Sequence, residues 1–251
     1  MKKGIKIFSI IIAVLAVGVF IAYKVFDKPL PEGAVTPEAD IMAQKMLTAI
    51  NKSAWDETKV VKWTFRGARH FVWDRERHLV NVKWDSYEAY INPGTQTGIA
   101  FEEGTKLEGS KSEEVVRQAI DNFNNDSFWL NAPAKVFDDG TERSIVVEED
   151  GRKGLMVKYA SGGTTPGDSY LWFLDESGLP TSYKMWVSII PVGGMEVTWE
   201  DWKTLPSGAK IAQNHKGSKL EIPITDIDSA VSLEALGISA EAATYFEEIT
   251  K

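Results

Sequence analysis

The chain has 251 residues, of which 43% are hydrophobic and 25% charged, a balance typical of a globular protein. Of its 28 basic and 36 acidic residues, five Lys and one Asp lie in residues 1–28, which leaves 23 basic and 35 acidic residues in the rest. Nucleic-acid binding relies on Lys and Arg that neutralise phosphates, so this acidic composition argues against a nucleic-acid partner. The absence of cysteine excludes disulfides, thiolate metal sites, a cysteine nucleophile and lipid attachment through cysteine.

An uncharged run of 17 residues extends from Ile7 to Tyr23 and follows three lysines within the first six residues. As a helix it would be roughly 26 Å long, close to the thickness of a bilayer core, about 30 Å. We predict that residues 1–28 form a transmembrane anchor that contacts the bilayer through residues 7–26. A cleaved signal peptide is the alternative, but the small residues of a cleavage site are missing where the bulky Phe20 and Tyr23 stand.

The charges around this run also predict its orientation. More basic residues precede the run than follow it, and basic flanks stay in the cytoplasm. We therefore expect a single-pass protein of the inner (cytoplasmic) membrane, with its domain on the periplasmic or extracytoplasmic side. Residues 29–36 form a proline-rich linker, because the three prolines within residues 27–38 favour an extended spacer, and residues 37–251 form the domain.

Hydrophobic periodicity predicts helices at three places in the domain. Thr36 is a suitable N-cap before Pro37, and apolar residues then recur every three or four positions over 37–52. A second helix begins at Ser112 and is predicted to fade after residue 123, and a third runs over 239–249. Alternating patterns separated by short turns predict antiparallel strands at 61–65, 71–73, 79–84, 87–91, 144–148, 155–159, 170–174, 182–190, 195–202 and 210–215.

Five short motifs accompany this order of helix, β-meander, helical insertion and second β-meander. They are DIMAQKMLTAIN (40–51), WTFRG (63–67), HFVWDRER (70–77), YLWFLDESGLPTSYKMW (170–186) and VTWEDWKTLPSGAKIAQNHKG (197–217). Over roughly residues 37–225 the chain resembles the periplasmic lipoprotein carriers and acceptors of the LolA/LolB type. The resemblance implies an α+β fold, in which a curved antiparallel sheet forms an unclosed β-barrel covered by helices, and a hollow side that holds acyl chains or another hydrophobic ligand.

Two features depart from that family. A carrier must diffuse, whereas this chain is predicted to be fixed by its own helix. An acceptor of the usual kind is anchored by a lipidated cysteine, which this sequence lacks. Shuttling of lipoproteins is therefore not expected.

Aromatic residues in the predicted strands are the candidate ligand-binding residues, because a curved sheet turns many of them to its concave side. They are Trp63, Phe65, Phe71, Trp73, Trp84, Trp172 and Trp186. The alternative is that the predicted helices fill the hollow, since a packed interior has the same apolar pattern as a cavity wall. The sequence leaves both arrangements open.

Polar motifs do not point to catalysis. The sequence contains no G-x-S-x-G, Walker A, G-x-G-x-x-G or H-E-x-x-H motif, so we predict neither enzyme activity nor a cofactor. His70, Asp74 and His78 have the even spacing of one strand face, but the arginines around them would repel a cation, and no metal site is predicted. His215 is expected at the surface.

These observations favour a membrane-anchored protein of the cell envelope that binds a lipid, a lipoprotein acyl chain or another hydrophobic ligand. The alternative function is a non-catalytic interaction subunit that docks another envelope protein through a sheet edge or an acidic face.

Overall fold

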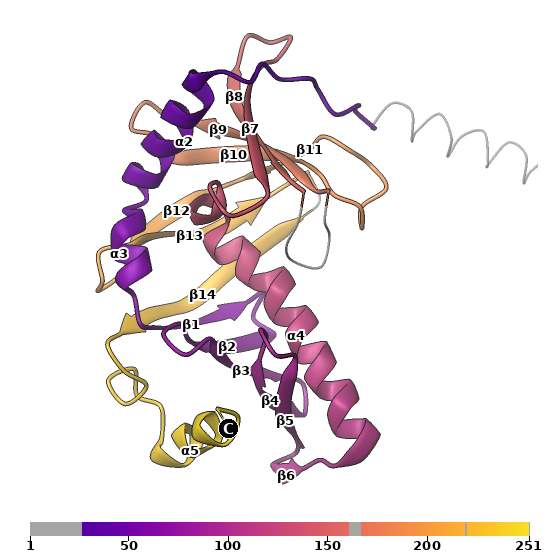
Figure 1. Cartoon of the computed structure of the whole chain (residues 1–251), viewed down its shortest axis with the longest axis vertical. Helices are drawn as coiled ribbons and strands as arrows, with labels where there is room; N and C mark the ends of the chain where they lie inside the picture. The colour runs from indigo at the N-terminus through magenta and orange to yellow at the C-terminus, as the bar shows by residue number, and fades with distance from the viewer. Residues whose placement is uncertain (1–26, 161–166, 219, 251) are drawn as a thin grey trace, which may run out of the picture.

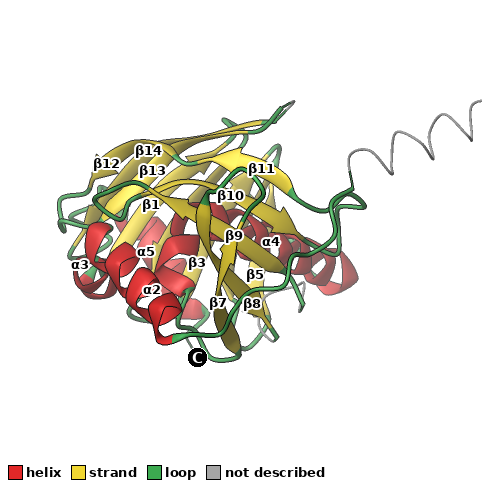
Figure 2. Cartoon of the chain, turned by 90° about the horizontal axis from the view of Figure 1, so that it is seen from above, coloured by secondary structure: helices red, strands yellow, loops and turns green. Residues whose placement is uncertain are grey.

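The computed structural model describes residues 27–160, 167–218 and 220–250. The apolar part of the predicted anchor, within residues 1–26, lies outside these ranges. In the described ranges, no helix has both the length and the apolar character that crossing a bilayer requires. Antiparallel strands dominate, with helices packed against the sheets (Figure 2).

The larger sheet has nine strands in the order β12-β13-β14-β1-β2-β3-β4-β5-β6. From β1 to β6 each strand pairs with the next one along the chain, and β14 joins this meander to β13. The strands are β1 (Val60–Phe65), β2 (Arg69–Asp74), β3 (Leu79–Trp84), β4 (Tyr87–Asn92), β5 (Thr97–Glu102), β6 (Thr105–Lys106), β12 (Glu200–Thr204), β13 (Lys210–Lys216) and β14 (Glu221–Ala230).

The smaller sheet has five strands in the order β11-β10-β9-β8-β7. They are β7 (Thr141–Val147), β8 (Lys153–Tyr159), β9 (Ser169–Leu174), β10 (Pro180–Trp186) and β11 (Met195–Thr198). Only Trp199 separates β11 from β12, so one stretch of chain leaves the smaller sheet and enters the larger one (Figure 1). Within the described residues the end strands β6 and β7 do not pair with each other, so the sheets stay unclosed, as the resemblance implies.

The helices are α2 (Pro37–Ala49), α3 (Lys52–Glu57), α4 (Gly109–Asn131) and α5 (Ala240–Glu248), with a 3₁₀ turn, η1 (Ala132–Lys135), after α4. Pro37 occupies the first turn of α2 together with acidic residues, which favours a helix start there. Ser239 caps α5 by accepting a hydrogen bond from the Ala242 N–H at 3.2 Å.

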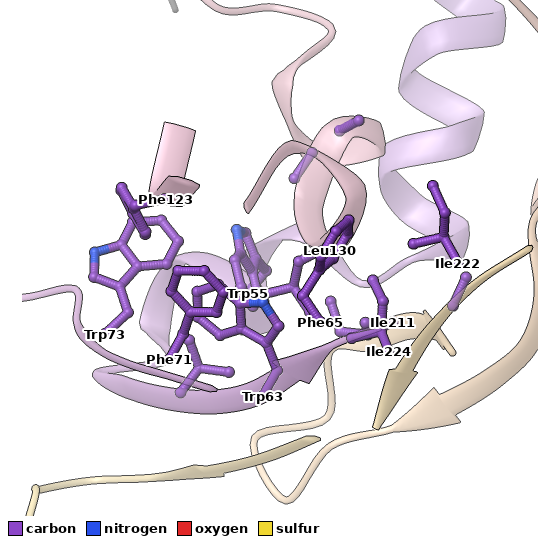
Figure 3. Close-up of a cluster of buried hydrophobic side chains, with 14 of the residues drawn as sticks. Trp55, Trp63, Phe65, Phe71, Trp73, Phe123, Leu130, Ile211, Ile222 and Ile224 are labelled. Carbon is purple, nitrogen blue, oxygen red and sulfur yellow. The ribbon is translucent and has the colours of Figure 1, made fainter. Parts of the chain in front are cut away.

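The helix α4 occupies the hollow of the larger sheet. Alternation along β1 and β2 turns Trp63, Phe71 and Trp73 to the concave side, where Phe123 of α4 packs among them (Figure 3). The ring centroids of Trp63 and Phe71 lie 4.6 Å apart in a stacked arrangement. The main core of the protein is therefore the contact between α4 and the sheet.

The helix α5 covers the opposite face of the same sheet. Phe246 of α5 is fully buried and forms a second small cluster with residues that alternate away from the hollow, among them Leu79, Tyr90 and Phe101. The ring centroids of Tyr90 and Phe246 lie 5.3 Å apart. The first meander is thus packed on both faces, which fixes its curvature.

Several predicted boundaries were wrong. The predicted helix 37–52 ends at Ala49, and Asn51, with a left-handed φ of 55°, separates it from the short helix α3, which was not predicted. The helix predicted to fade after residue 123 continues to Asn131. The predicted strand 182–190 ends at Trp186, and the predicted strand 195–202 is divided into β11 and β12. The strands β5, β6 and β14 were not predicted.

Candidate functional site

The structure places six of the seven aromatic candidates in the core. Trp63, Phe65, Phe71, Trp73, Trp84 and Trp172 are all at most 9% exposed and belong to one buried cluster. Helix α4 fills the hollow against the strands β1 to β3. Of the two arrangements that the sequence leaves open, this part of the protein therefore has the packed interior and not the ligand cavity. A ligand-binding role for these residues stays a prediction that their packing does not favour.

Trp186 lies on the other face of the smaller sheet. In the pairing of β9 with β10, Trp172 stands opposite Tyr183 and Trp186 stands opposite Ser169. Residues directly opposite each other share a face, so Trp172 and Trp186 point to opposite sides. Trp186 packs against the outer cluster around Leu171 instead.

A cavity of about 600 Å³ remains in the hollow beneath the smaller sheet. This volume is in the range of small-molecule sites. It lies between the C-terminal half of α4, the segment after η1, the strands β8 to β10 and the loop that follows β10. The lining residues are Asn124, Asn125, Phe128, Trp129, Lys135, Phe137, Asp138, Asp139, Tyr159, Asp168, Tyr170, Tyr183, Met185, Val187, Ile189 and Ile190. None of the seven predicted residues is among them.

Aromatic rings form the inner wall of this cavity. The Phe128 ring centroid lies 4.8 Å from that of Tyr170 and 6.0 Å from that of Tyr159. The Tyr183 centroid lies 5.2 Å from that of Tyr170 and 5.8 Å from that of Trp129. Such a wall offers a large apolar contact surface to a ligand.

Two buried hydroxyl groups belong to this wall. Tyr159 is 8% exposed and Tyr183 fully buried, and neither hydroxyl has a hydrogen-bond partner in the described part of the chain. Burial raises the pKa of both phenols, so both stay protonated and can donate a hydrogen bond. Both hydroxyl oxygens lie beneath the cavity surface, so a molecule in the cavity would contact the tyrosine rings and not these oxygens.

Asp168 holds the cavity wall to the loop after β10. Its carboxylate accepts a hydrogen bond from the Ser188 N–H at 3.0 Å and one from the Tyr170 hydroxyl at 3.4 Å. The pKa of Tyr170 is raised by burial and, to a lesser degree, by this carboxylate. Asp168 is itself buried, and it positions both Tyr170 and the loop residues that line the cavity.

The C-terminal half of α4 is held in place by a buried ion pair. Arg69 on β2 contacts Asp126 through two hydrogen bonds, Nε to Oδ2 at 2.5 Å and Nη2 to Oδ1 at 3.0 Å. This pair anchors α4 to the larger sheet, and the helix then presents Asn124, Phe128 and Trp129 to the cavity. The segment predicted to leave the helix thus supplies part of the site.

His215 is buried, so its expected surface position was wrong. It is 0% exposed in β13, where Trp199 lies 4.2 Å and Trp129 5.4 Å away between ring centroids. Its Nδ1 lies 3.3 Å from the Thr198 carbonyl oxygen. Burial lowers the pKa of His215 to about 4. A neutral imidazole therefore supports Trp129 from behind the cavity wall.

We expect His215 to make the protein less stable in weak acid. The unfolded chain takes up a proton below pH 6.5, whereas folded His215 does so only near pH 4, so the stabilisation is complete above pH 6.5 and is lost as the pH falls towards 4. The loss is about 3 kcal/mol of unfolding free energy. Urea denaturation at a series of pH values measures it, and His215→Gln removes this component.

The control for this experiment is His78→Gln, because His78 is exposed. That variant should keep the pH dependence of the native chain. An unchanged pH dependence in His215→Gln would contradict a neutral, buried His215.

The histidines considered for a metal site are not brought together with a free carboxylate. Asp74 accepts a hydrogen bond from Arg77 Nε at 2.7 Å, and Thr64 Oγ1 lies 2.9 Å from His70 Nδ1. Across the described ranges, no three His, Asp or Glu side chains gather in a way that could hold a metal ion.

The chain is similar to two proteins of known structure. A DUF1329 family protein from Desulfovibrio piger has a TM-score of 0.40 and 10% identity, covering 83% of this chain and 99% of that one. A putative outer membrane lipoprotein-sorting protein domain from Vibrio parahaemolyticus has a TM-score of 0.37 and 9% identity, covering 83% of this chain and 100% of that one. No family model and no curated protein matches the chain. The likeness to both structures is one of fold alone.

Proposed function

We propose that this chain is a non-catalytic protein of the cell envelope that binds a lipid, a lipoprotein acyl chain or a similar hydrophobic ligand. The observation that supports the proposal is the cavity of about 600 Å³ with its aromatic wall. This cavity does not lie where the sequence predicts the site. The hollow is filled by α4 under the strands β1 to β3, whereas it is open under the strands β8 to β10. The predicted anchor in residues 1–28 supports an envelope location.

The composition of the cavity favours an amphiphile. Each methylene moved from water into an apolar site contributes about 0.8 kcal/mol, so an alkyl chain gains affinity with length. Asn124 and Lys135 also line the cavity and can meet a polar atom of the ligand. The hydroxyls of Tyr159 and Tyr183 stay protonated because burial raises their pKa, so neither acts as a base. This property favours binding over acid–base catalysis.

Filling the cavity is expected to abolish ligand binding. Val187 lines the cavity, and Val187→Trp would place an indole in the space that the ligand needs. Labelling of the full chain by a photoactivatable fatty acid should fall at least about tenfold, which corresponds to about 1.4 kcal/mol of binding free energy. The labelled residues, identified by mass spectrometry, should lie in α4 and β10.

Val147→Trp is the matched control, because Val147 is 63% exposed at the end of β7 and does not line the cavity. It should be labelled like the native chain. If the native chain takes up no label, or if both variants are labelled equally, the cavity is not a lipid site. The interaction-subunit function would then be the better proposal.

A further inference from the structure

The chain that follows the predicted anchor is attached to the domain. We call residues 27–35 the strap. Asp27 Oδ1 accepts a hydrogen bond from the Gly193 N–H at 2.9 Å, and the Lys28 N–H donates to the Gly193 carbonyl oxygen at 3.1 Å. Trp186 Nε1 donates to the Lys28 carbonyl oxygen at 2.8 Å. The strap is therefore fixed to the loop after β10 from its first described residue.

Two glycines make this close contact feasible. A Cβ atom at Gly193 would lie 2.8 Å from the Lys28 carbonyl oxygen and 2.4 Å from Cδ1 of Trp186. Gly194 has φ of 76°, and a Cβ atom there would lie 2.7 Å from Cβ of Lys28. Any side chain at these positions would push the strap away, so the loop sequence suits this attachment.

The same loop forms the rim of the cavity. Val187, Ile189 and Ile190 all line it, and the side chain of Ile189 is 68% exposed. Phe137, from the segment after η1, also lines the cavity and is 40% exposed. Two large apolar side chains thus stand at the opening in contact with solvent. Exposed apolar side chains at the rim of an apolar cavity suit contact with another apolar body.

We propose that the cavity opens towards the bilayer that holds the predicted anchor, with Ile189 and Phe137 in the membrane interface. Lys28 follows the apolar run Ile7–Tyr23 by only five residues, and an extended chain spans at most about 3.6 Å per residue. The attached loop therefore lies within about 18 Å of the membrane surface. A lipid chain can then pass between bilayer and cavity without crossing water. This inference rests on the proposed function.

The charges at the opening define the kind of contact. Asp138 and Asp139 follow Phe137 and also line the cavity, and of these two only Asp138 has a cationic partner among the described residues, Lys135 at 2.6 Å. A surface with excess negative charge is not drawn to anionic headgroups. The contact is therefore apolar insertion, and adding anionic lipid should not strengthen it.

The experiment uses the full chain in phosphatidylcholine vesicles, and the absence of cysteine allows a single label. Ile189→Cys is labelled with an environment-sensitive fluorophore. The emission should shift to the blue and be quenched by lipids that carry a quencher in the upper acyl chain. Val231→Cys is the control, since Val231 is 78% exposed, does not line the cavity, and follows β14 in the segment that leads to α5, which lies away from the strap in Figure 1. Its label should stay unquenched.

A second variant tests the role of the strap. Gly193→Val should detach residues 27 and 28 and reduce the quenching of the label at position 189, while far-UV circular dichroism stays native. Equal quenching at positions 189 and 231, or quenching that is unaffected by Gly193→Val, would overturn the inference. Fatty-acid labelling in the same vesicles separates the two proposals. If the fatty acid labels the chain but the fluorophore at position 189 is not quenched, the lipid-binding proposal stands and the orientation is rejected. If the fluorophore is quenched but the fatty acid does not label the chain, the orientation stands and lipid binding in the cavity is rejected.

Discussion

Trp63→Ala is expected to lower the free energy of unfolding by about 3 to 5 kcal/mol, the range for truncating a large buried aromatic residue. Trp63 is 1% exposed, stacks on Phe71 and contacts Phe123 of α4. Its removal leaves a void between helix and sheet that the strands cannot close without losing their register. Urea denaturation followed by far-UV circular dichroism measures the loss.

Trp186→Ala is the matched control, since this residue is only half-buried on the outer face. It should lose clearly less stability. Ligand binding by Trp63→Ala, measured where the variant is still folded, should equal that of the native chain. A variant with native stability and weakened binding would show that the first meander lines the ligand site after all.

Arg69→Met is expected to cost about 3 to 5 kcal/mol near neutral pH, because it leaves the buried Asp126 carboxylate without its cation. The Asp126 side chain is 0% exposed, whereas that of Arg69 is 30% exposed. Asp126→Asn should therefore cost less, since the remaining guanidinium can reach water. The two variants together test which partner depends on the pair.

The pH dependence of Arg69→Met gives a second signature. Burial already raises the pKa of Asp126, and Arg69 opposes this effect. Without Arg69 the folded-state pKa rises further above that of the unfolded chain, so the variant should recover stability as the pH falls through the raised pKa towards the pKa of the unfolded chain. Arg117→Met on the exposed side of α4 is the control and should stay within about 0.5 kcal/mol of the native chain. Equal losses in Arg69→Met and Asp126→Asn would contradict the asymmetry.

Alternation predicted most strands because half-buried strands repeat every two residues. The strand β14 escaped prediction because Pro223 interrupts its pattern and proline is rare in central strands. The Pro223 carbonyl oxygen still accepts a hydrogen bond from the Arg66 N–H at 2.9 Å, although proline has no N–H of its own to donate. A register shift in the pairing with β1, and φ of 52° at Asp226, then accommodate an irregular strand. These features depend on the partner strand, which a local pattern does not reveal.

The position of the site was harder to predict than the fold. Tryptophans marked the core, whereas the cavity is lined by tyrosines on β8 to β10 and by Phe128 and Trp129 on α4. Polar residues 124–127 indicated an end to the helix, but the Arg69–Asp126 pair supports its continuation. One feature of the sequence could have located the cavity. Tyr183 and Met185 are two residues apart on β10 and point to the cavity face, whereas Trp186 follows Met185 directly and points to the opposite face. Whether α4 fills the hollow depends on packing volume, which periodicity does not measure.

The strap has a consequence for the sheet edge as well as for orientation. Ala34 and Ile145 exchange backbone hydrogen bonds of 2.8 and 2.9 Å, so the strap pairs with part of β7, the last strand of the smaller sheet. Gly33 must stay small there, because a Cβ atom would lie 2.2 Å from Ser144 Oγ. An open edge strand is a template for pairing with another chain. The strap thus covers β7 at Ile145, and a fragment cut at Pro37 would leave the backbone of Ile145 open to pairing.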